Sequence, residues 1–173
     1  MARLPRTEWT DIASEVKTEY STDLAQYPML PELYSVLGNA PDMLSAWVDF
    51  AWTLRRAPKS SRRLRELLIL RTGGRLSAPY CVAAHTKMAA DAGATPEEIV
   101  AVDDWHASSL FGETDCACLA LADAMMSRST SDEDIARVRH LLGEEQTIEI
   151  VITIAFYIAV ASVTTALDLS PGG

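Results

Sequence analysis

The sequence predicts a single all-α domain, a helical bundle, because its apolar residues recur at helical spacing and no stretch alternates with period two strongly enough to compete. In the clearest segment, residues 41–56, apolar side chains recur every three or four positions, as they do along one face of a helix. Residues 151–163 are rich in β-branched side chains, which favour strands, but this run exceeds the length of about ten residues that strands rarely pass. A chain of 173 residues has the size of one domain and is long enough to bury a core.

Composition sets the two ends of the chain apart from the rest. We expect residues 1–27 to form an N-terminal arm, with one short stretch of helical apolar spacing at residues 9–16. Residues 28–170 are expected to form the helical domain, and residues 171–173 a tail. No internal repeat and no linker divides this domain further.

Capping residues mark where several helices begin. Pro79 suits the first position of a helix because its φ is fixed, and a serine within residues 60–61 can cap the preceding helix. Thr95 can cap a third helix, with Glu98 as its partner in a capping box. Residues 32–38 are expected to form a short helix or a turn. The predicted helices are residues 41–56, 61–76, 79–92, 96–105, 115–127, 132–142 and 144–167.

Charge limits the classes of partner. The net charge is −9 and the pI is about 4.7, which argues against binding nucleic acid or an anionic membrane, since both require a basic surface. Residues 1–6 lack the apolar run of a signal peptide. We therefore expect a cytoplasmic protein whose three cysteines are reduced.

The stretch at residues 150–167 carries no charged side chain and approaches the length of a membrane-spanning helix. However, Thr153, Tyr157 and Ser162 interrupt it with polar groups, and no basic cluster flanks either end, as membrane topology signals would require. We predict a helix buried in the domain or at a subunit interface, and no membrane span.

Three residues able to move protons lie close together in the sequence. Cys81 and His85 are four residues apart, so they share one face of the helix that Pro79 would open. Glu66 adjoins residues 67–70, which are apolar on all sides, as in a buried helix. A carboxylate in such a place needs a partner or a shifted pKa. A buried carboxylate near a thiol and an imidazole has the composition of a proton relay.

Three longer pieces of the sequence carry a further signal. They are Arg63-Leu64-Arg65-Glu66-Leu67, Tyr80-Cys81-Val82-Ala83-Ala84-His85-Thr86 and Ala92-Gly93-Ala94-Thr95-Pro96-Glu97-Glu98-Ile99. Together they resemble the carboxymuconolactone decarboxylase superfamily, and the middle piece looks most like its alkyl hydroperoxidase D branch. The resemblance extends over roughly residues 28–170.

The resemblance implies an all-helical homo-oligomer, a trimer or hexamer, that acts as an antioxidant peroxidase on a small-molecule substrate. In the peroxidase branch the site holds a Glu, two cysteines in a C-x-x-C and a His four residues after the second cysteine. Glu66, Cys81 and His85 match the Glu, the second and nucleophilic cysteine, and the His, which makes them the predicted catalytic residues. Ala78 stands where the first cysteine would be, so the redox pair is incomplete. The aromatic residues expected to contact the substrate are Tyr80, Trp105 and Tyr157.

Each of these residues also has a purely structural interpretation. Cys81 could be a small buried hydrophobe, as free cysteines often are. Glu66 could be no more than the ion-pair partner of an arginine at position 63, 65 or 71. Tyr80 could simply pack in the core.

The other two cysteines have a structural interpretation, and the spacing of the residues does not favour a metal site. Cys116 and Cys118 are two residues apart, so on a helix they face different directions, and we expect both in the core. Cys81 and His85 lack further ligands at the spacing that structural zinc needs, so we predict neither a metal nor a cofactor.

Three hypotheses about function follow. In the first, Cys81 attacks a hydroperoxide or a disulfide, Glu66 and His85 manage the protons, and an external thiol restores the cysteine. In the second, the same residues perform cofactor-free acid–base chemistry, a lyase or isomerase reaction on a small organic acid or lactone. In the third, the protein is a non-catalytic helical oligomer that binds a partner through residues 150–167. The motif around Cys81 favours the first.

Overall fold

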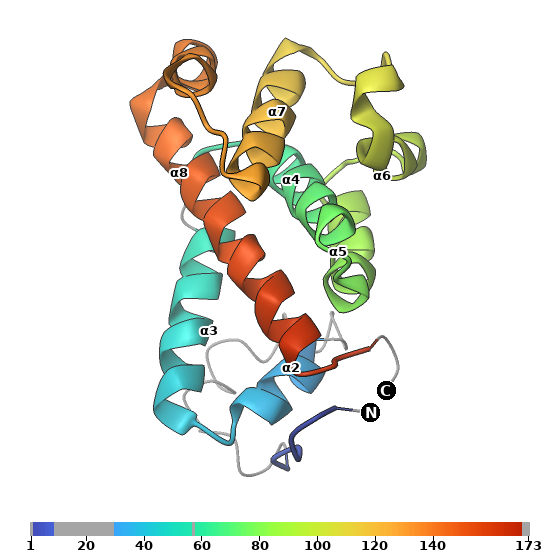
Figure 1. Cartoon of the computed structure of the whole chain (residues 1–173), viewed down its shortest axis with the longest axis vertical. Coiled ribbons are helices and arrows are strands. Elements are labelled where there is room, and N and C mark those ends of the chain that lie inside the picture. The colour runs from blue at the N-terminus through green and yellow to red at the C-terminus, as the bar shows by residue number, and fades with distance from the viewer. Residues whose placement is uncertain (1, 9–29, 57, 171–173) are drawn as a thin grey trace.

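Helices account for all of the regular secondary structure in the residues that the computed structural model describes, which are 2–8, 30–56 and 58–170 (Figure 1). The elements are α2 (Leu30–Leu37), α3 (Pro41–Arg56), α4 (Arg62–Arg75), α5 (Pro79–Asp91), α6 (Pro96–Ala101), the 3₁₀ helix η2 (Val102–Ala107), α7 (Glu113–Ser127) and α8 (Asp132–Ala166). The all-α prediction is confirmed. The short helix expected at residues 9–16 lies outside the described residues.

Helix α4 is the centre of the bundle and packs against α5, α7 and α8 (Figure 1). Every side chain from Leu64 to Thr72 is buried, which matches the prediction of a helix that is apolar on all sides around residues 67–70. A large core cluster of side chains from α4, α7 and α8 surrounds it. Any charged residue on α4 must therefore find its partner inside the protein.

The predicted caps are present. The Ser61 hydroxyl accepts a hydrogen bond from the N–H of Leu64 (3.4 Å). The Thr95 hydroxyl accepts from the N–H of Glu98 (3.2 Å), while the Glu98 carboxylate accepts from the N–H of Thr95 (2.9 Å). Pro79 occupies the start of α5. These local bonds satisfy N–H groups that a helix start otherwise leaves without partners.

Helix α8 contains the apolar stretch and is bent at Gly143. This glycine has φ of 79°, a conformation that only glycine adopts without strain, so the helices predicted at 132–142 and 144–167 form two arms of one element. By length and composition α8 could cross a membrane, but 44% of its most apolar window is buried inside the protein. Its side chains Val138, Ile150 and Ile154 lie in the core, which explains the hydropathy without a membrane.

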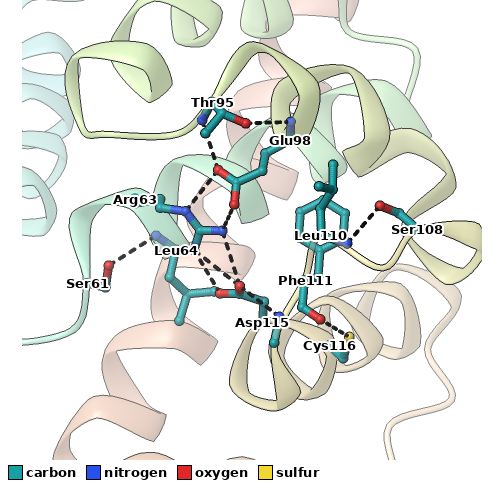
Figure 2. A network of polar contacts seen from close by, with 11 residues as sticks. Ser61, Arg63, Leu64, Thr95, Glu98, Ser108, Leu110, Phe111, Asp115 and Cys116 are labelled. Atoms are coloured by element: carbon teal, nitrogen blue, oxygen red, sulfur yellow. Dashed lines mark hydrogen bonds and ion pairs between the residues drawn. The ribbon is translucent and has the colours of Figure 1, made fainter.

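Arg63 ties α4 to two neighbouring elements (Figure 2). Its Nε donates to Glu98 on α6 (3.1 Å), and its two terminal nitrogens donate to Asp115 on α7 (3.1 and 3.2 Å). Arg71 makes a similar paired contact with Asp123 on α7 (2.7 and 2.8 Å). These arginines therefore hold the bundle together and leave Glu66 to other partners.

Candidate active site

Glu66 lies in the middle of α4 and is completely buried. One carboxylate oxygen, Oε2, lies 2.7 Å from Nδ1 of His85 on α5. The other, Oε1, forms an ion pair with Arg62, one helical turn earlier on α4. Burial by itself raises the pKa of the Glu66 carboxyl, but the charge and hydrogen bond of His85, followed by those of Arg62, outweigh burial and lower this pKa below its ordinary value. Glu66 is thus a buried, ionised carboxylate.

The structural alternative for Glu66, a pair with the arginine at 63, 65 or 71, is excluded. Arg63 and Arg71 bind the carboxylates of α6 and α7 described above, and Arg65 donates to the hydroxyl of Ser60 (3.1 Å). The partner is Arg62, which the sequence analysis missed. The i, i+4 spacing from Arg62 to Glu66 is the signal that could have identified it.

Cys81 lies in the first turn of α5, one turn before His85, and its side chain is buried. Burial, and then the charge of Glu66, raise the pKa of the Cys81 thiol to about 12. The helix start favours a thiolate at this position, but desolvation is the larger effect. In the resting protein the thiol is therefore protonated at neutral pH, and it needs a base before it can act as a nucleophile.

Cys81 is not paired with a second cysteine of this chain. Ala78 is buried at the start of α5, in the same apolar cluster as Cys81. Cys116 and Cys118, which complete the three cysteines, lie on α7 as free thiols. Cys118 belongs to the core cluster around α4, as predicted, and Cys116 packs against that cluster.

Two neighbouring cavities meet at His85. The first, of about 460 Å³ including the space open to solvent, is lined by Glu66, Arg62 and His85 among others. The second, of about 370 Å³ measured in the same way, is lined by Cys81 and His85. Tyr34 and Tyr157 also contribute to both cavities. The imidazole therefore lines both the cavity that contains the carboxylate and the cavity that contains the thiol.

Two of the three predicted aromatic residues lie at these cavities. Tyr157 packs edge-on against the His85 ring at a centroid distance of 4.9 Å and lines both cavities. Tyr80 lines the thiol cavity, and its hydroxyl accepts a hydrogen bond from the N–H of Leu33 (3.1 Å), so it both packs and lines the cavity. Tyr34, which the sequence analysis also missed, comes from α2, and no spacing pattern connects that helix with α5.

Trp105 lies apart from the cavities. Its Nε1 donates to Asp123 (3.1 Å), the carboxylate that Arg71 holds, and its ring is in the core cluster. Trp105 is not among the residues that line either cavity. Its position supports packing of η2 on α7, and we leave it out of the site proposed below.

Comparison with known proteins agrees with the resemblance. Residues 41–124 match the model of the carboxymuconolactone decarboxylase family. This match supports the resemblance to the carboxymuconolactone decarboxylase superfamily, and the chain has the fold of the alkyl hydroperoxidase D proteins. A comparison with curated protein sequences found no match.

Solved structures share this fold over 79% to 99% of the chain. The apo debrominase Bmp8 is 17% identical with a TM-score of 0.86, covering 98% of this chain and 92% of its own. A peroxidase-related protein with an alkylhydroperoxidase AhpD core from Ralstonia eutropha JMP134 is 16% identical with a TM-score of 0.84, covering 99% and 92%. A protein of Agrobacterium tumefaciens described as a putative antioxidant defence protein AhpD is 18% identical with a TM-score of 0.73, covering 79% and 96%. At these identities the likeness establishes the fold alone.

Proposed function

We propose that this protein is a thiol-dependent redox enzyme in which Cys81 is the nucleophile and the Glu66–His85 pair manages its proton. The observation that carries the proposal is the 2.7 Å contact between Glu66 Oε2 and His85 Nδ1, because it orients an imidazole that also lines the cavity of Cys81. A carboxylate that holds one ring nitrogen fixes the tautomer and the orientation of the ring, so that the other nitrogen can accept a proton. His85 can therefore serve as the base that the buried, protonated thiol of Cys81 needs.

With a hydroperoxide as substrate, the Cys81 sulfur attacks the terminal peroxide oxygen and the O–O bond breaks. The thiol proton passes through His85 to the departing alkoxide, which leaves as an alcohol, and Cys81 becomes a sulfenic acid. An external thiol then forms a mixed disulfide with Cys81 and releases water. A second external thiol releases the Cys81 thiol and leaves as a disulfide. The external reductant is required because Ala78 replaces the partner cysteine.

The test is to treat the protein with cumene hydroperoxide, remove the oxidant, alkylate under denaturing conditions and quantify each cysteine peptide by mass spectrometry. We expect Cys81 to lose alkylation and dithiothreitol to restore it. Half-buried Cys116 is an internal control that should stay alkylatable, and Glu66→Gln should slow the oxidation of Cys81. A Cys81 that stays fully alkylatable after peroxide would refute the proposal.

Acid–base catalysis on a small organic acid or lactone is a second candidate, and the raised pKa of Cys81 favours it. A thiol that holds its proton at neutral pH is suited to donate that proton, and such a reaction needs no second sulfur. Cys81→Ser separates the two candidates. It abolishes the redox reaction but retains part of an acid–base turnover, whereas Glu66→Gln impairs both.

The match to the family model, whose family includes enzymes, supports a catalytic role, and the resemblance supports a trimer or hexamer. The acidic composition and the absence of an apolar run at residues 1–6 support a cytoplasmic location. Exposed apolar side chains on α8, at Ile148 (60% exposed) and Ile152 (36%), support burial of this helix between subunits. Light scattering coupled to size exclusion tests the assembly. A monomer at micromolar concentration would contradict it.

A further inference from the structure

Tyr157 brings a third helix to the two cavities. It lies on α8, which packs against α4 and α5, the helices that carry Glu66 and Cys81. Its ring packs edge-on against the rings of His85 and Phe156, at centroid distances of 4.9 and 5.4 Å. Because Tyr157 lines both cavities, it borders the space of the carboxylate, the imidazole and the thiol.

The hydroxyl of Tyr157 has no structural partner. It forms no hydrogen bond with any other residue in the described ranges 2–8, 30–56 and 58–170. Tyr80, which also lines the thiol cavity, differs in this respect, because its hydroxyl accepts the bond from Leu33. A hydroxyl that no protein group holds can rotate to donate its hydrogen to a molecule in the cavity.

The surroundings keep this hydroxyl protonated. Burial, and then the charges of Glu66 and Cys81, raise the pKa of Tyr157 well above its ordinary value. The influence of both charges also means that the hydroxyl lies near both groups. At neutral pH, Tyr157 is therefore a hydrogen-bond donor beside the thiol.

When the Cys81 sulfur attacks the terminal oxygen of a hydroperoxide, the O–O bond breaks and negative charge develops on the departing oxygen. We propose that the Tyr157 hydroxyl is a catalytic group that donates a hydrogen bond to this departing oxygen. Tyr157 keeps its own proton, and the alcohol receives the thiol proton that His85 carries. A donor already in place stabilises such charge without reorganisation during the reaction. The inference deepens the proposed function and rests on it.

The test compares two oxidants that release different anions. Cumene hydroperoxide releases an alkoxide, whereas peracetic acid releases acetate, which is stable as an anion without help. The rate at which Cys81 loses alkylation is measured for each oxidant on the full chain. Tyr157→Phe should slow the reaction of cumene hydroperoxide by about 100-fold, the effect of removing one such donor. It should slow that of peracetic acid by less than about fivefold, because the bond to acetate strengthens little in the transition state.

Tyr80→Phe is the matched control, since it removes the other hydroxyl whose ring lines the thiol cavity. Whatever its effect on either rate, it should leave the ratio of the two rates unchanged within about twofold, because its hydroxyl serves Leu33. Urea denaturation gives the complementary contrast. Tyr157→Phe should keep the wild-type midpoint, because no partner in the fold loses a bond.

Three results would overturn the inference and leave the redox proposal in place. They are equal slowing of both oxidants by Tyr157→Phe, no slowing of either, and a lowered urea midpoint in this variant, which would reveal a structural partner. A wild-type Cys81 that reacts with neither oxidant is a different result, and it would overturn the proposed function together with this inference.

Discussion

Replacing His85 in two different ways separates its structural role from its proton-transfer role. His85→Ala leaves the fully buried Glu66 carboxylate without the donor now 2.7 Å from its Oε2, with only Arg62 as a partner. Leaving a buried acceptor without its hydrogen-bond donor costs about 1–3 kcal/mol, and more when the acceptor is charged. His85→Asn places an amide N–H close to the position of Nδ1, so it should cost only about 1 kcal/mol. Both variants lack the second ring nitrogen and should lose catalysis.

The assay is urea denaturation of the two variants and the wild-type protein from pH 7 down to pH 3. The folded-state pKa of Glu66 is lowered, so its contribution to stability is complete above the unfolded-state pKa of about 4.3 and is lost as the pH falls through the folded-state value. The penalty of His85→Ala should therefore shrink in acid. Two results would contradict this reasoning: equal stability of the Ala and Asn variants at pH 7, or a stability loss in His85→Ala that does not change with pH. Either result would show that the Glu66–His85 contact does not stabilise the fold by the stated amount.

Three further outcomes are expected from the same geometry. Tyr80→Phe should lower the free energy of unfolding by about 1–3 kcal/mol, because a buried backbone N–H of α2 loses its acceptor; an unchanged urea midpoint would contradict this. Trp105→Phe should cost about 1 kcal/mol through loss of the bond to Asp123 and leave catalysis intact, and a selective loss of turnover would return this residue to the site. Glu66→Gln should lower the pKa of Cys81 from about 12 because it removes the nearby negative charge. The pKa should stay above the ordinary thiol value, because burial is the larger cause of the shift. Thiolate absorbance measured against pH in the wild-type protein and the variant gives the two pKa values.

The helical fold could be predicted from the sequence because its signals are local. The caps at Ser61 and Thr95 and the proline that opens α5 act within one turn of the chain, and the structure contains each of them. The four-residue spacing of Cys81 and His85 likewise follows from one turn of one helix. The family resemblance added the pairing of Glu66 with that helix, which no local rule provides.

The electrostatic state of the site could not be read from the sequence. The helix start predicts an acidified thiol at Cys81, but the side chains packed over it from other elements remove water and raise the pKa. The positions of the competing carboxylates decide which arginine pairs with Glu66. Glu98 on α6 forms an ion pair with Arg63, and Asp123 on α7 forms one with Arg71.

The sequence by itself therefore determined the helices, their boundaries to within a few residues and the three residues expected to be reactive. Only the tertiary structure decided that Glu66 is ionised between His85 and Arg62, that Cys81 is a protonated thiol, and that Trp105 belongs to the core. The physical reason is that helix formation depends on neighbours within about four residues, whereas desolvation and charge pairing depend on groups that come together only when the chain folds.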